Sequence, residues 1–67
     1  MELLINGESH TAADGCSMLE LLASLAIDPG RVAIEYNAVI LKKDLWGSTQ
    51  LKAGDRLEIV HFVGGGR

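Results

Sequence analysis

The sequence is poor in cysteine, in positive charge and in long hydrophobic runs. It has one cysteine in 67 residues, so it can form neither an internal disulfide nor a four-thiolate zinc or iron–sulfur site. The net charge of −3 argues against a nucleic-acid or anionic-membrane binder, which would carry a basic patch. No segment approaches the roughly 20 apolar residues that span a bilayer, and no signal peptide opens the chain. We expect a cytoplasmic protein with no nucleic acid, no membrane and no metal among its partners.

What the sequence does contain is enough apolar material for one small domain. Hydrophobic residues make up 48% of it, which argues against disorder. The single cysteine, Cys16, is expected to be a reduced thiol in a turn or at a helix start. The alternative is a reactive thiol activated by a helix N-terminus.

The first half of the chain predicts a hairpin followed by a helix. Asn6-Gly7 is a strong type I′ turn signal, so it predicts a hairpin of strands at residues 2–5 and 8–12. Ser17 and Glu20 have the spacing of a capping box, and apolar residues then recur with helical period. We predict one helix over residues 17–26, stopped by Asp28-Pro29-Gly30.

The second half predicts further strands around a short helical turn. Val32–Tyr36 alternates like a strand, Asn37-Ala38 makes a tight turn, and the chain then resumes an extended run. Trp46 is expected to plug one end of the core, with a recognition role as the alternative. One helix and four or five strands in this order predict an α+β fold: a ubiquitin-like β-grasp, with a mixed four- to five-stranded sheet packed on one helix.

The last strand, over residues 56–63, leads directly into glycines. Leu57 and Ile59 share one face with His61, so Val60 and Phe62 should point outward as an apolar patch for a protein partner. The alternative is a bulge or curled sheet that buries them. We expect a β-grasp domain at residues 1–63 and a flexible glycine tail at residues 64–67.

The tail itself indicates chemistry. A run without Cβ atoms can thread a channel that admits no side chain, and a carboxylate at its tip can attack the α-phosphate of a nucleotide held by an activating enzyme. The tail is then a substrate, and the partner supplies positioning and charge stabilisation. His10 and His61 have no paired nucleophile and no metal-ligand spacing, so an independent enzyme is disfavoured.

Over essentially its whole length the chain resembles the ThiS family, the sulfur carriers of thiamine biosynthesis. The resemblance is carried by the stretches 3–7, 32–37, 51–55 and 59–66, together with Leu21-Leu22 and Trp46. It implies that Gly66 is adenylated with ATP by a ThiF-type enzyme and converted to a thiocarboxylate by a persulfide donor. The sulfur then passes to a ThiG-type thiazole synthase. The chain would be a protein co-substrate that binds no cofactor, with Gly64 and Gly65 in its tail and Val60, Phe62 and Val63 at the partner contact.

Arg67 departs from the family pattern, because the implied mechanism needs glycine to be last. Arg67 is therefore expected to be removed by a peptidase, or not to be native. Two other functions stay open: a MoaD-like carrier for molybdopterin or another sulfur-transfer pathway, and a non-catalytic β-grasp interaction module. Deleting Gly65 and Gly66 separates carrier from module, since only sulfur transfer needs the tail.

Overall fold

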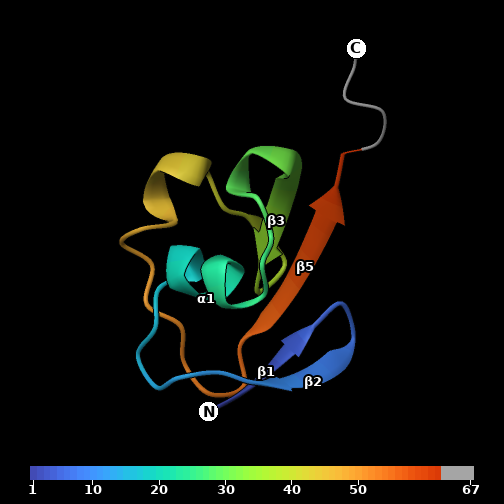
Figure 1. Cartoon of the computed structure of the whole chain (residues 1–67). Helices are drawn as coiled ribbons and strands as arrows, with labels where there is room; N and C mark the ends of the chain where they lie inside the picture. The colour runs from blue at the N-terminus through green and yellow to red at the C-terminus, as the bar shows by residue number, and fades with distance from the viewer. Residues whose placement is uncertain (63–67) are drawn as a thin grey trace.

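The computed structural model describes residues 1–62 and shows one helix packed on one face of a five-stranded sheet (Figure 1). The strand order is β2-β1-β5-β3-β4, so the last strand lies in the middle. Strand β5 runs parallel to β1 and antiparallel to β3, which makes the sheet mixed. The predicted β-grasp is confirmed. Its elements are β1 (Glu2–Ile5), β2 (Glu8–Thr11), α1 (Met18–Ser24), β3 (Val32–Tyr36), β4 (Val39–Ile40) and β5 (Arg56–His61), with 3-10 turns at Pro29–Arg31 and Lys43–Leu45.

The two tight turns adopt the backbone that their sequences predict. Asn6 and Gly7 have φ values of 51° and 82°, as a type I′ hairpin turn requires. Asn37 and Ala38 also have positive φ, at 50° and 73°, where β3 turns into β4.

The helix begins as predicted and ends differently. The Ser17 side chain accepts from the Glu20 N–H, and the Glu20 carboxylate accepts from the Ser17 N–H, which completes the capping box. The helix ends at Ser24, two residues before the predicted end. Ala26 takes a left-handed φ of 57°, and the Ile27 N–H donates to the Leu22 carbonyl at 2.9 Å. This is a Schellman motif, so the helix stops before Pro29 is reached.

The core lies between α1 and the sheet. Trp46 is 1% exposed, and its indole N–H donates to the Leu41 carbonyl at 2.9 Å. Its predicted place as a core plug is confirmed, and the alternative of a recognition role is wrong. The buried apolar residues are Leu3, Ile5, Cys16, Met18, Leu21, Leu22, Val32, Ile34, Trp46, Leu51, Leu57 and Ile59.

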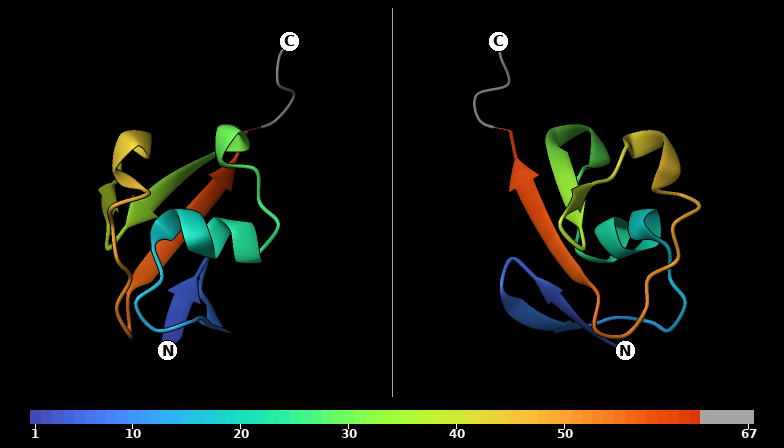
Figure 2. Two further views of the ribbon diagram at one scale, coloured as in Figure 1. Left: turned by 60° about the vertical axis from the view of Figure 1, so that its left-hand side comes forward. Right: turned by 180° about the vertical axis from the view of Figure 1, so that it is seen from behind.

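The opposite face of the sheet carries no helix in the part of the chain that the structure describes. In Figure 2, α1 and the two 3-10 turns lie on one side of β3 and β5, and no described helix crosses the other side. We call this other side the open face. Within residues 1–62, no helix is both long enough and apolar enough to cross a membrane.

Candidate functional site

The exposed end of β5 lies on the open face. Leu57 and Ile59 are buried toward α1, whereas Val60 is 57% exposed and Phe62 is 59% exposed. The alternation along β5 therefore turns Val60 and Phe62 outward, and the alternative that a bulge buries them is wrong. His61 is also exposed, although it was expected to continue the inward set.

A shallow apolar hollow adjoins Val60. Ala33 of β3 pairs with Val60 of β5, and its small side chain leaves room between Val60 and Ile40 of β4. The hollow measures about 230 Å³ and is lined by Ala33, Ile34, Glu35, Ile40 and Val60. A second, more polar hollow of about 350 Å³ lies beside it, lined by Glu35, Asn37, Ala38, Arg56 and Glu58. The open face thus offers an apolar surface next to charged groups, as protein-binding surfaces often do.

Two sets of hydrogen bonds hold the last residues of β5 in place. On one side the Phe62 N–H donates to the Arg31 carbonyl at 2.9 Å, which extends the pairing with β3. On the other side the Asn6 side-chain amide takes the place of a backbone rung. Its Oδ1 accepts from the Ile59 N–H at 2.7 Å, and its Nδ2 donates to the Ile59 carbonyl at 3.1 Å. β5 is therefore held on both edges as far as Ile59, and on its β3 edge as far as Phe62.

A buried carboxylate anchors the start of β5. Asp55 is 9% exposed and accepts hydrogen bonds from the Tyr36 hydroxyl at 2.5 Å, the Lys52 N–H at 2.8 Å and the Asn37 amide at 3.3 Å. Burial by itself would raise the pKa of Asp55, but these hydrogen bonds outweigh it and the pKa is lowered. The hydrogen bond that the Tyr36 hydroxyl donates to Asp55 raises the pKa of Tyr36 to about 12, and burial of the hydroxyl acts in the same direction.

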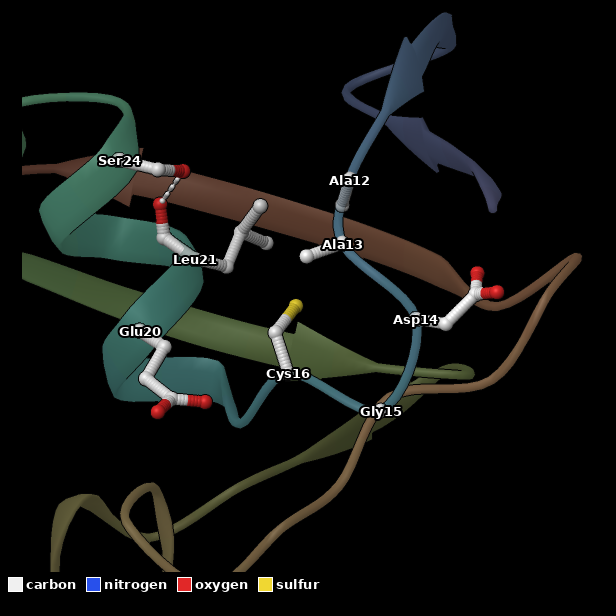
Figure 3. A pocket seen from close by; sticks show the side chains of 8 residues that line it. All are labelled: Ala12, Ala13, Asp14, Gly15, Cys16, Glu20, Leu21 and Ser24. Carbon is white, nitrogen blue, oxygen red and sulfur yellow. Dashed lines mark hydrogen bonds between the residues drawn. The ribbon is translucent and has the colours of Figure 1, made fainter.

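Cys16 lies in a different part of the molecule, beside α1. Figure 3 shows its thiol among Ala13, Leu21 and their neighbours, in a hollow of about 330 Å³. The residue is a free cysteine that is 9% exposed and belongs to the core. This burial favours the structural role over the reactive one.

The remaining predicted site residues are Val63, Gly64, Gly65, Gly66 and Arg67, and they lie outside the described residues. Their roles, and the partner-binding roles of Val60 and Phe62, stay predictions. Neither histidine is brought to a catalytic partner: His10 Nε2 lies 3.9 Å from a Glu8 carboxylate oxygen, and His61 is exposed. Within residues 1–62, no group of three potential metal ligands comes together.

Sequence reasoning missed three residues of the open face: Ala33, Glu35 and Ile40. The signal was present in the alternation of β3. Because Val32, Ile34 and Tyr36 share the inner face, Ala33 and Glu35 must point the other way. Ile40 follows from its pairing with Glu35.

Comparisons with known proteins agree with one another. The family model described as "ThiS family" matches residues 3–66. The chain is 40% identical over 65 residues to the sulfur carrier protein ThiS of Bacillus subtilis, covering 96% of this chain and 98% of that protein. It superposes on the crystal structure of the thiamine biosynthesis protein ThiS from Geobacter metallireducens with a TM-score of 0.85 at 33% identity, covering 98% of this chain and 100% of that one.

A second kind of relative is much longer. The chain is 37% identical over 67 residues to a thiazole synthase of Magnetococcus marinus, covering 100% of this chain and 21% of that protein. The chain spans about a fifth of the length of the thiazole synthases that it matches.

Proposed function

The chain belongs to the ThiS family, and from that premise we propose that it is a sulfur carrier for thiamine biosynthesis. In this proposal it is a protein co-substrate and not an enzyme. The observation that carries the proposal is the family match, which runs through the glycines to Gly66. The ThiS of Bacillus subtilis, which is similar over nearly its whole length, supports the same function.

The proposed chemistry takes place at the carboxylate of Gly66. A ThiF-type enzyme uses ATP to adenylate that carboxylate and releases pyrophosphate. The terminal sulfur of a persulfide donor then displaces AMP to form an acyl disulfide, and a thiol reductant cleaves its S–S bond to leave the thiocarboxylate and a disulfide. Adenylation makes the carbonyl carbon a good electrophile, and the partner supplies the charge stabilisation for the step. The carrier contributes a tail without side chains, which a narrow active-site channel admits.

The acceptor of the sulfur is proposed to be a ThiG-type thiazole synthase. The thiazole synthases among the relatives support this partner, since each contains a stretch similar to 98% or more of this chain. We propose that Val60 and Phe62 form part of the partner contact, because they are exposed on the open face directly before Val63. A cytoplasmic location belongs to the same proposal.

Reaction at Gly66 requires a free carboxylate there, so the bond between Gly66 and Arg67 must be broken first. The test is to incubate two forms, one ending at Gly66 and one ending at Arg67, with the adenylating enzyme, ATP, the persulfide donor and a thiol reductant. Intact mass spectrometry should find sulfur in place of oxygen only in the form ending at Gly66. Equal conversion of both forms would contradict the need for cleavage, and conversion of neither would contradict the carrier function.

A further inference from the structure

Two carboxylates face each other on the open face. Glu35 of β3 and Glu58 of β5 are Cα partners in the sheet, and both side chains are exposed. Like charges placed directly opposite one another destabilise a sheet. Among residues 1–62 neither carboxylate forms a salt bridge, although Arg56 lies two residues before Glu58 on the same face. No salt bridge among the described residues offsets this repulsion, so the pair calls for another explanation.

The acidic pair adjoins the apolar hollow described above. Glu35 lines both that hollow and the polar one, so its carboxylate stands at the boundary between them. On one side of the boundary are Ala33, Val60 and Ile40. On the other side are Glu58 and Arg56, with Asn37 and Ala38 from the turn after β3. An apolar hollow that ends at two carboxylates suits a side chain with an aliphatic stem and a cationic head.

We propose that this surface receives an arginine side chain of the thiazole synthase. Its methylene groups would rest on Ala33 and Val60, and its guanidinium group would lie between the carboxylates of Glu35 and Glu58. Arginine is preferred to lysine because its planar fork has five N–H donors and can serve two carboxylates at once. The bound cation would also remove the repulsion that the pair suffers in the free protein.

The choice of the thiazole synthase rests on the proposed function. A stretch similar to this entire chain is part of a longer thiazole synthase, which supports a direct contact between the carrier and the thiazole synthase. The pair lies on the same face as Val60 and Phe62, the last outward residues before the tail that the sulfur acceptor must reach. The overall charge of −3 favours association with a basic surface on that partner.

The test compares two charge reversals of equal size. Glu58→Lys places a cation in the proposed site, and Glu8→Lys makes the same change in net charge on β2, the edge strand at the far side of the sheet. Calorimetry with the thiazole synthase should show binding weakened at least about tenfold by Glu58→Lys, equal to about 1.4 kcal/mol. Glu8→Lys should leave it within about twofold, a change of about 0.4 kcal/mol.

Thermal unfolding of the free variants gives the readout that a merely structural role would not produce. Glu58→Lys should melt at the same temperature as the wild type or higher, because the introduced ammonium group would pair with the Glu35 carboxylate. A second variant tests the apolar half: Ala33→Leu fills the hollow from the sheet surface and should also weaken binding about tenfold. Wild-type binding should weaken with added salt, and the Glu58→Lys variant should respond less.

Several outcomes would overturn the inference. One is a Glu58→Lys or an Ala33→Leu variant that binds the thiazole synthase as the wild type does. Another is weakened binding only to the adenylating enzyme, or a change in oligomeric state of the free carrier, since each would assign the surface to a different occupant. A form ending at Gly66 that takes up no sulfur in the mass-spectrometric assay would instead contradict the proposed function, so the two failures are distinguishable.

Discussion

At the scale of single residues, the Asp55 carboxylate joins segments that are far apart in the sequence. It accepts from Tyr36 at the end of β3, from Asn37 in the turn that follows, and from Lys52 before β5. The partners could not be predicted, because their approach depends on β3 and β5 pairing across the sheet.

This network predicts how stability depends on pH. The folded pKa of Asp55 lies below the unfolded value of 3.8, so its contribution is present above that value and is lost as the pH falls through the folded pKa. The folded pKa of Tyr36 is raised from 10.0 to about 12, so its contribution is present below about pH 10 and is lost as the pH rises through about 12. Denaturant unfolding should therefore show a free energy of unfolding that is constant between these two pH ranges. It should decrease toward acid pH and toward alkaline pH.

Two variants check which groups are responsible. Asp55→Asn should lower the free energy of unfolding near pH 7 by about 1.5–3 kcal/mol, because hydrogen bonds to a charged group are lost. It should also flatten the acid fall. Tyr36→Phe should flatten the alkaline fall while leaving Lys52 and Asn37 to hold the carboxylate. An acid fall that persists unchanged in Asp55→Asn would contradict this assignment.

At the scale of elements, the start of α1 could be read from the sequence and its end could not. A capping box is local, since Ser17 and Glu20 satisfy each other within one turn. The end is decided by Ala26, whose φ of 57° is unfavourable for any residue with a Cβ. Nothing in an alanine signals a left-handed cap, so Pro29 was mistaken for the residue that stops the helix.

The strained cap gives a prediction at the same scale. Ala26→Gly should raise the free energy of unfolding by about 1 kcal/mol, because glycine adopts positive φ without a Cβ clash. The matched control is Ala23→Gly, the same substitution at an exposed position inside α1, which should lower it by about 0.5–1 kcal/mol. Urea unfolding of the two variants measures both signs. If Ala26→Gly destabilised as much as Ala23→Gly, the Schellman assignment would be wrong.

The sheet shows the same division between local and distant effects. Alternation predicted the faces of β3 and β5, because the side-chain period of a strand is fixed by its backbone. It did not predict that the Asn6 side chain would extend the β1–β5 pairing to Ile59. That contact spans 53 positions in the sequence, and Asn-Gly predicts only the turn.

Asn6→Gly separates the two roles of this residue. Glycine keeps the turn geometry but removes both hydrogen bonds to Ile59, so the free energy of unfolding should fall by about 1–3 kcal/mol. The Ile59 amide should exchange with solvent faster, while the β5 amides that pair with β3 stay protected. Unchanged exchange at Ile59 would show that the Asn6 amide contributes nothing to holding β5.

At the scale of the whole molecule, the fold and the working surface were predictable to different degrees. The β-grasp followed from the order of elements and from the family resemblance, and the structure confirms it. The outward positions of Val60 and Phe62 followed from alternation in one strand. The acidic pair and its hollow did not, because they are formed by side chains that meet across β3, β4 and β5.

The last prediction concerns the separate roles proposed for the folded domain, which docks, and for the glycine tail, which reacts. If the folded domain docks and the glycines react, removing Gly65 and Gly66 from a form that ends at Gly66 should abolish sulfur transfer and leave docking within about threefold, or roughly 0.7 kcal/mol. Val60→Asp should instead weaken docking while leaving the reactive tail unchanged. It puts a charge on the exposed apolar surface and should weaken docking about tenfold, yet it should leave thermal stability nearly unchanged because Val60 is exposed. Calorimetry with the thiazole synthase measures docking, and mass spectrometry of the product measures sulfur transfer. A deletion that abolishes docking as well as transfer would mean that the tail supplies most of the binding energy, and the open face would then lose its proposed role.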